Sequence, residues 1–144
     1  MTLVTRNHPK LTLEGARAVL AAAQRRAEEI RVPMDVAVVD DGGHLLAFER
    51  MDGAKPSSIA ISLVKAQAAA LRRAATGPAI AGDQTNVPLV LGLAIANPAH
   101  QTPIRGGVPL VVDGQVIGAI GASAGTEDQD LDVARAGAAA IEKE

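Results

Sequence analysis

Apolar residues recur at helical spacing near the start of the chain and at strand spacing soon after it. Leu13–Ile30 has the periodicity of an amphipathic helix, and Thr12 stands where it would cap that helix. Met34–Val39 is an apolar, β-branched run typical of a buried strand, and His44–Met51 alternates as a second strand. The Asp and Gly residues at 40–43 favour a tight turn, so the two strands are predicted to form a hairpin.

The second half of the chain repeats this helix and hairpin pattern. Four elements are predicted there: a helix capped by Ser57 or Ser58 and running to about Ala75, a short helix at Pro88–Ala96, a hairpin of Val108–Val112 and Gln115–Ala122 through Asp113-Gly114, and a last helix at Leu131–Lys143. The order α-β-β-α-(α)-β-β-α indicates an α/β (α+β) fold, an antiparallel sheet with helices packed on it. Residues 1–144 are expected to form one domain, with an irregular N-terminal arm at 1–11.

Composition narrows the function classes. Aromatic residues make up 1% of the chain, Phe48 being the sole one, and the formal net charge is −2, so nucleic-acid binding by stacking or by a basic surface is not expected. Cysteine is absent, which excludes disulfides, thiolate catalysis and Cys-type zinc sites. The start of the chain lacks the apolar segment of a signal peptide, and no long apolar run predicts a membrane span. A cytoplasmic protein is expected.

The second predicted helix carries the clearest candidate site. Lys65 is the one charged residue between Lys55 and Arg72, and Ser58, Ser62 and Lys65 are spaced to share a helix face. The amides at the helix start and the Lys65 ammonium would suit an anionic ligand. In a partly dry pocket Lys65 could also serve as a base or a Schiff-base nucleophile. The alternative is that this face is simply the solvent face.

Two further cationic positions point to the same chemistry. Arg50 ends a strand on the face expected to hold Leu46 and Phe48, and Asp52 follows two residues later. The pair is either a structural ion pair or a carboxylate clamp in which Asp52 orients Arg50. Arg105 precedes Gly106 and Gly107, whose backbone could form an anion nest or merely lead into the hairpin.

The histidines and the acidic cluster fit weaker hypotheses. His8, His44 and His100 match no metal-binding spacing, so no metal site is predicted and ordinary exposed roles are expected. Each histidine, or Met51, could in principle ligate haem. The acidic residues Glu127, Asp128, Asp130 and Asp132 precede the last predicted helix, where Asp128 or Asp130 would cap it; their spacing does not suit a calcium loop.

These motifs, in this order, resemble the GlcG/HbpS family. The resemblance rests on VAVVDDGGHLLAFERMDGAKPSS, on Lys65-Ala66, on GGVPLVVDGQVIGAIGAS and on the EDQD segment, and it covers about residues 12–143. The family includes haem-binding proteins, the C-terminal domain of PduO-type proteins and small proteins of catabolic operons. The resemblance implies a profilin-like domain and homo-oligomers from dimers to octamers, and it favours a site at Ser58 and Lys65.

The chain also departs from the family pattern. Ile104-Arg105 stands where Phe-Pro is common, and Ser123-Ala124-Gly125 stands where Ser-Gly-Gly is common. The chain has Lys65-Ala66-Gln67-Ala68-Ala69 where Lys-Ala-x-Thr-Ala is usual. Residues 76–104 are the segment that least resembles the family. Any difference in ligand between this chain and its relatives is expected at these positions, which include His100.

Three functional hypotheses follow. The first is a cofactor-independent catabolic hydrolase, lyase or isomerase acting on a small anionic compound, with Lys65 and Asp52 in proton transfer and Arg50 as clamp. Ser58, His100, Arg105, Gly106 and Gly107 would bind the ligand, and Lys65→Met should abolish turnover but leave the fold intact. The second is a haem or tetrapyrrole binder or sensor, with His8 or His44 as ligand. The third is a non-catalytic oligomeric accessory protein.

Overall fold

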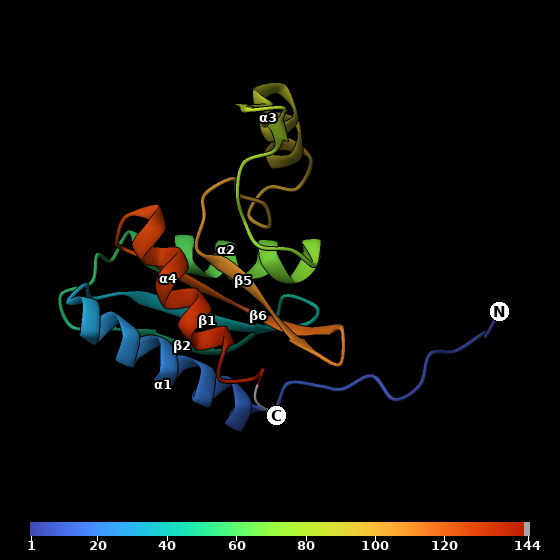
Figure 1. Cartoon of the computed structure of the whole chain (residues 1–144), viewed down its shortest axis with the longest axis horizontal. Helices are drawn as coiled ribbons and strands as arrows, with labels where there is room; N and C mark the ends of the chain where they lie inside the picture. Colours follow the sequence, from blue (N-terminus) through green and yellow to red (C-terminus); the bar gives the residue numbers. More distant parts are fainter. Residues whose placement is uncertain (143–144) are drawn as a thin grey trace.

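The body of the molecule is one antiparallel sheet between helices. The computed structural model describes residues 1–142. Four strands lie in the order β2-β1-β6-β5, with every neighbouring pair antiparallel (Figure 1). The strands are β1 (Asp35–Asp40), β2 (Leu45–Arg50), β5 (Gly107–Val112) and β6 (Gln115–Ser123). The mixed α/β fold with an antiparallel sheet, expected from the sequence, is confirmed.

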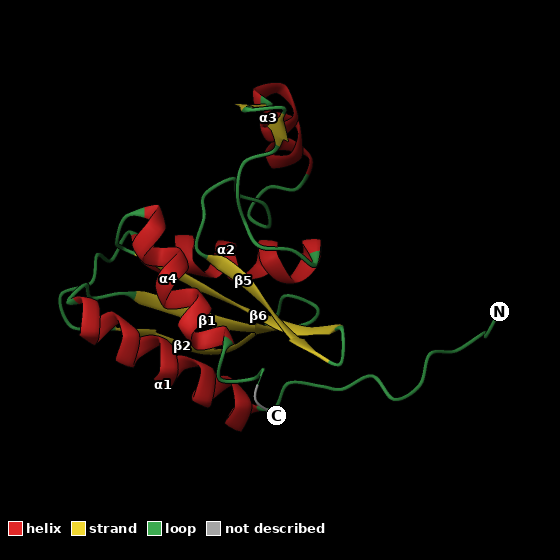
Figure 2. Cartoon of the chain, in the orientation of Figure 1, coloured by secondary structure: helices red, strands yellow, loops and turns green. Residues whose placement is uncertain are grey.

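Helices cover both faces of the sheet (Figure 2). Helices α1 (Leu13–Ile30) and α4 (Glu127–Ala138) pack on one face, and α2 (Ser58–Arg72) packs on the other. The larger apolar core lies beneath α1 and α4, whereas the α2 side is built mainly from alanines such as Ala37, Ala66 and Ala119. These small side chains let α2 approach the sheet closely.

The first helix and both hairpins lie where the sequence predicts them. The Thr12 side chain accepts a hydrogen bond from the Gly15 amide, which caps α1. The predicted strands differ from the observed ones by single residues at their ends. In the second hairpin turn Asp113 and Gly114 both have positive φ, of 51° and 74°, as a two-residue hairpin turn requires.

Two predicted helix boundaries are wrong, and so is the predicted cap of the last helix. Helix α2 ends at Arg72 rather than near Ala75, because Arg73 adopts a left-handed conformation and closes the helix. Helix α4 begins at Glu127, not Leu131, because Thr126 and Gln129 form a capping box in place of the expected Asp128 or Asp130 cap. It ends at Ala138, and the predicted end at Lys143 lies outside the described residues.

Strand β2 does not keep a simple alternation. Its register with β1 shifts between Val38 and Val39, so Ala47 pairs with Val38 and Leu45 with Val39. Leu46 therefore packs in the core of the α1 and α4 side, whereas Phe48 packs on the α2 side. The expectation that Leu46 and Phe48 share a face is wrong, because the bulge turns Leu46 over.

Residues 79–97 project from the body (Figure 1). They contain the short strands β3 (Ile80–Ala81) and β4 (Gln84–Thr85), which the sequence did not reveal, and α3 (Val87–Ala96), which it did. The Asn86 side chain caps α3 by accepting a hydrogen bond from the Leu89 amide. We refer to residues 79–97 as the arm.

Candidate functional site

The polar face of α2 points into the protein. Ser58, Ser62 and Lys65 are buried against the sheet, and the Lys65 side chain is 1% exposed. The reading of this face as the solvent face is therefore wrong. Close packing explains the burial: a Cβ added to Gly121 of β6 would lie 3.1 Å from the Lys65 Cβ and would overlap the Ser62 carbonyl oxygen.

Lys65 is surrounded by acceptors. Its Nζ donates to the Asp130 Oδ2 at 2.7 Å and to the Ala122 carbonyl oxygen at 3.0 Å, and it lies 3.5 Å from the Ser123 Oγ. The second Asp130 oxygen accepts from the Gly125 amide at 2.9 Å. Because a protonated amine in such contacts has no free lone pair, this geometry favours anchoring over nucleophilic attack.

Gly106 and Gly107 lie against the same lysine. Gly106 has a φ of 123°, and a Cβ on it would lie 2.9 Å from the Lys65 Nζ. The Gly107 amide already donates to the Thr76 Oγ1 at 2.9 Å, and the Arg105 guanidinium lies 4.0 Å from Glu127. The structure thus places Gly106 and Gly107 against Lys65. The Gly107 amide and the Arg105 guanidinium, however, already have partners within the protein.

Asp35 is a buried acid that the sequence analysis missed. It lies at the start of β1, with Arg50 of β2 and Ser123 of β6 as its partners in register, so the three share the α2 face. Asp35 is fully buried, and no described residue forms a hydrogen bond with either carboxylate oxygen. Burial raises the pKa of Asp35, and the positive charge of Arg50 partly opposes that rise. The sequence did carry a signal for Asp35, because it is the one carboxylate in an otherwise apolar predicted strand.

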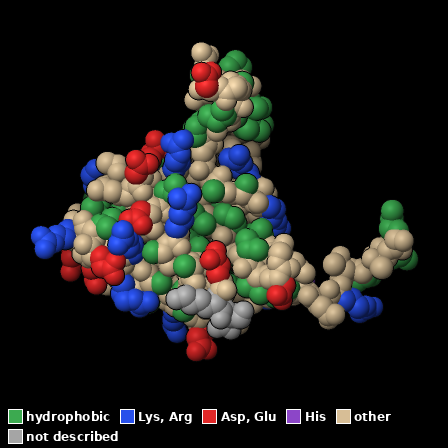
Figure 3. All heavy atoms as spheres, viewed as in Figure 1, with side chains coloured by type: hydrophobic (Ala, Val, Ile, Leu, Met, Phe, Trp, Pro, Cys, Tyr) green, Lys and Arg blue, Asp and Glu red, His purple; other side chains and the backbone are tan. Residues whose placement is uncertain are grey.

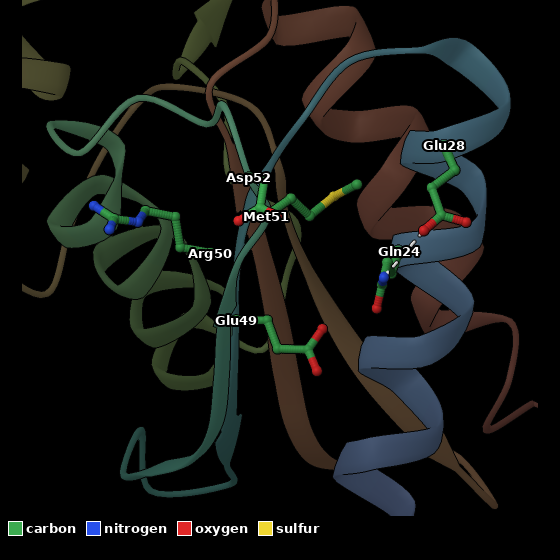
Figure 4. A pocket seen from close by; sticks show the side chains of 6 residues that line it. All are labelled: Gln24, Glu28, Glu49, Arg50, Met51 and Asp52. Carbon is green, nitrogen blue, oxygen red and sulfur yellow. Dashed lines mark hydrogen bonds between the residues drawn. The ribbon is translucent and has the colours of Figure 1, made fainter.

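Arg50 and Asp52 border a groove on the outer side of β2. The groove has a volume of about 450 Å³ and is lined by Gln24, Glu28, Glu49, Arg50, Met51 and Asp52. Glu49 and Met51 face α1, whereas Arg50 extends toward the α2 side (Figure 4). The Gln24 amide donates to Glu28 at 3.0 Å. With three carboxylates on its walls, this groove suits a ligand with cationic or hydrogen-bond-donating groups better than an anion.

Two of the three histidines meet at the β1–β2 turn. The His44 Nδ1 lies 3.3 Å from the Asp40 Oδ1, and the His8 Nε2 lies 3.4 Å from the Asp41 Oδ2. Lys10 also bonds to Asp41 at 3.1 Å, and this hydrogen bond is the main cause that lowers the pKa of Asp41. We call these residues the histidine turn.

An apolar groove continues from the histidine turn. It begins at Pro9, Lys10 and Leu11 and has a volume of about 470 Å³. Its apolar walls come from α1, the β5–β6 hairpin and the segment after α4: Leu11, Ala18, Val112, Ile117, Ala140 and Ile141. His100 lies apart from this cluster, exposed in the loop that follows α3. The described residues hold no group of three or more side chains placed to bind a metal ion.

These features define a small α+β domain with helices on both faces of a four-stranded antiparallel sheet. Residues 11–139 match the family model described as haem degrading protein HbpS-like. The chain belongs to this family, as its motifs led us to expect.

Sequence relatives support this assignment. The chain is 43% identical over 113 residues to protein GlcG of Escherichia coli K12, covering 78% of this chain and 81% of GlcG. It is 39% identical over 120 residues to an uncharacterized 15.0 kDa protein of Citrobacter freundii, covering 83% and 84% of the two chains. The corrinoid adenosyltransferase PduO of that organism is 30% identical over 131 residues, which is 39% of its length.

Solved structures share the fold. Protein ORFY of Klebsiella pneumoniae superposes with a TM-score of 0.83 at 33% identity over 97% of both chains. A PduOC:heme complex gives 0.79 at 28% identity over 92% of this chain and 96% of that one. HbpS gives 0.79 at 31% identity over 96% and 94%. No described helix of this chain is long and apolar enough to cross a membrane.

Proposed function

We propose that this chain binds haem or a related tetrapyrrole at the histidine turn. His44 is the observation that carries the proposal. Its Nδ1 lies beside the Asp40 carboxylate, and its side chain is 82% exposed, so the Nε2 faces outward. Histidines that ligate metals commonly donate their other ring N–H to a carboxylate, which fixes the tautomer and the ring orientation.

The surroundings of His44 fit a tetrapyrrole in two further respects. His8 lies at the same turn beside Asp41 and offers a second imidazole as a ligand. The adjoining groove offers aliphatic walls to a macrocycle, and Lys10 at its rim, which bonds to Asp41 but is 68% exposed, would also attract a propionate group. The family, described as haem degrading, and the solved PduOC:heme complex favour this ligand over a catabolic substrate. Bound haem would supply the redox or sensing chemistry.

A hemin titration tests the proposal. We expect a saturable Soret shift in the wild type and its loss or displacement in His44→Ala, with a smaller effect in His8→Ala. His100→Ala is the matched control, because His100 is exposed but lies outside the histidine turn. Absence of a shift at micromolar hemin would contradict haem binding, and equal effects of all three substitutions would contradict the assignment to His44.

A catabolic enzyme acting on a small organic compound is the second candidate. Asp35 favours it, because a buried carboxyl with a raised pKa next to an arginine is typical of a general acid. The roles assigned to Lys65, Arg50, Asp52, Ser58 and Arg105 remain predictions. Native mass spectrometry of the purified protein would identify a retained compound, and Asp35→Asn should release it. A purified chain that carries none and turns over no small carboxylic acid would count against this candidate.

The proposal also covers the oligomeric state and the cellular location of the protein. We propose a homo-oligomer, between a dimer and an octamer, in the cytoplasm. The resemblance to the family supports the first statement, and the second follows the expectation from the sequence. Sedimentation of the purified chain measures the first, and cell fractionation measures the second.

A further inference from the structure

Asp35 is a buried carboxylate for which the chain supplies no hydrogen-bond donor. It is 0% exposed, and neither of its oxygens has a hydrogen-bond partner among the described residues. Two serines on the same side of the sheet have other partners. The Ser62 Oγ donates to the Ile59 carbonyl oxygen at 2.8 Å, and the Ser123 Oγ lies 3.5 Å from the Lys65 Nζ. A buried carboxylate without a donor is costly, so this position suits a donor from a bound molecule.

Arg50 lies across from Asp35 and is also without a charged partner. The two residues pair in register between β2 and β1, which puts their Cβ atoms about 5 Å apart on the α2 side of the sheet. The Arg50 guanidinium forms no ion pair with a described carboxylate, and its side chain extends toward α2 (Figure 4). One negative and one positive group therefore lie side by side, each open to a partner from outside the chain.

Helix α2 runs alongside β1 with its first turns toward Asp35. Gly43, which follows β1, packs on Leu71 near the end of α2, where an added Cβ would lie 3.6 Å from the leucine side chain. Nearer the other end of β1, an added Cβ at Gly121 would overlap the carbonyl oxygen of Ser62, which lies in the first half of the helix. Asp35 lies two residues beyond the β1 partner of Gly121 in the same direction. The start of α2 and Asp35 therefore meet at one end of the sheet.

The start of α2 is open to an anion. Thr12, Asn86 and Thr126 cap the other described helices with side-chain hydrogen bonds, whereas no side chain caps α2. Free backbone amides and the helix dipole attract a carboxylate to such an end. Together with Arg50 they form an anion-binding element, and it lies beside a buried carboxylate that needs a donor.

We propose that this end of the sheet binds a small 2-amino acid, with its ammonium group on Asp35 and its carboxylate between Arg50 and the start of α2. The two groups of such a molecule are attached to one carbon atom, so they match an anion and a cation that lie opposite each other in register. The ammonium group donates to the Asp35 oxygens and balances their charge. This inference rests on the second candidate function, whose ligand class it names, and involves no residue of the histidine turn.

The charges favour a molecule that carries both groups. An acid without an ammonium group would leave the Asp35 oxygens without a donor, and an amine without a carboxylate would leave Arg50 without an acceptor. Figure 3 shows acidic and basic side chains over the body of the molecule and mainly hydrophobic ones over the arm. A zwitterionic ligand therefore suits the body rather than the arm.

The loop between β2 and α2 provides a route to the site. Residues 52–57 form this loop, and all of them except Ala54 are exposed. Their backbone hydrogen bonds are local, such as those from the Ala54 amide to Met51 and from the Ser58 amide to Lys55. The loop can therefore open without breaking the sheet.

Calorimetry with the purified chain tests the ligand class. We expect at least one of glycine, L-alanine and L-serine to bind saturably. Propionate, which has the size of alanine but no ammonium group, should bind more weakly by about tenfold or more. Lactate, with a hydroxyl in the place of the ammonium group, should also bind more weakly. No binding of any of the three amino acids would overturn the proposal, and lactate or propionate that binds as tightly would overturn the pairing of an ammonium group with Asp35.

Two variants test the residues. Asp35→Asn and Arg50→Gln should each weaken the binding of the tightest amino acid by about tenfold or more, with an unchanged circular dichroism spectrum. Glu49→Gln is the matched control and should bind as the wild type does, because Glu49 precedes Arg50 on β2 but faces α1 (Figure 4). Wild-type affinity in a folded Asp35→Asn chain would overturn the assignment.

The same measurements separate this site from the functions proposed above. Saturable binding of an amino acid that is not converted would support the site and count against the enzyme. Conversion of another carboxylic acid by a chain that binds no amino acid would overturn the site alone. Hemin titrated in the presence of the amino acid should give the same Soret shift as hemin alone, because the histidine turn lies at the other end of β1 from Asp35. Loss of that shift would place the amino acid at the histidine turn and overturn the proposal.

Discussion

Lys65 on α2 donates a 2.7 Å hydrogen bond to Asp130 on α4, so a helix on one face of the sheet is tied to a helix on the other. The two side chains are 1% and 4% exposed. The Ala122 carbonyl oxygen and the Gly125 amide complete their hydrogen bonds. A buried ion pair of this kind adds little stability compared with apolar residues, but removing one partner leaves the other charge uncompensated.

Lys65→Met should therefore destabilise the fold, contrary to the expectation drawn from the sequence. The free energy of unfolding should fall by about 3–5 kcal/mol, because the Asp130 carboxylate would be buried without its cation. Urea unfolding measures this loss. The double variant Lys65→Met/Asp130→Leu should recover much of it. If the Lys65→Met protein were as stable as the wild type but had lost an activity or a ligand, the result would support a catalytic role for Lys65.

Asp35→Asn should raise the stability of the protein at neutral pH. The carboxylate is buried without a hydrogen bond, and a neutral amide of the same shape lowers the cost of desolvation. We expect a gain of about 1 kcal/mol in the free energy of unfolding. Arg50 opposes part of this gain, because its attraction to the carboxylate would be lost. Asp52→Asn, at an exposed carboxylate nearby, is the matched control and should change little.

The effect of Asp35 should depend on pH with a definite sign. Because the folded-state pKa of Asp35 is raised above its ordinary value of 3.8, the folded protein holds this proton where the unfolded chain has released it. The contribution of Asp35 to stability is then most favourable below 3.8 and is lost as the pH rises through the folded-state pKa. The stability difference between Asp35→Asn and wild type should shrink on acidification. A difference that is constant with pH would show that the two states share one pKa.

Local patterns predicted the elements that are stabilised locally. Helix α1 was found because its cap and its apolar face lie within one segment, and the hairpins were found because Gly residues mark their turns. The start of α4 was missed because the acidic residues were read as the cap. The pattern of Thr126 followed three residues later by Gln129 was present in the sequence and would have placed it correctly.

The candidate site was less predictable because its contacts cross the fold. Spacing placed Lys65 with Ser58 and Ser62, but only the packing of α2 on Gly121 shows that this face is buried. Asp130, the partner of Lys65, lies 65 positions away in the chain. His44 meets Asp40 within one turn, whereas the contact of His8 with Asp41 depends on how the N-terminal segment returns to the sheet.

Gly121→Ala should be strongly destabilising. A Cβ at this position would overlap the Ser62 carbonyl oxygen and would lie 2.6 Å from the Ala66 amide nitrogen, so α2 would have to move away from the sheet. Overpacking of this kind costs about 1–3 kcal/mol or more when backbone must shift. Gly77→Ala is the matched control, because the nearest atom to its added Cβ is 3.9 Å away. Equal thermal melting of the two variants would contradict this account of the α2 packing.

Ala124→Gly should stabilise the protein. Ala124 has a φ of 109°, a conformation in which a Cβ is strained and glycine is not. This is also a position where the family pattern favours glycine, so the chain carries the strain through its own substitution. Relief of the strain exceeds the greater backbone entropy that glycine gives the unfolded chain, and we expect a net gain of about 1 kcal/mol. Ala139→Gly, at a φ of −60°, gives the matched control and should lose stability. Urea midpoints of the two variants that move in the same direction would contradict the assignment of strain to Ala124.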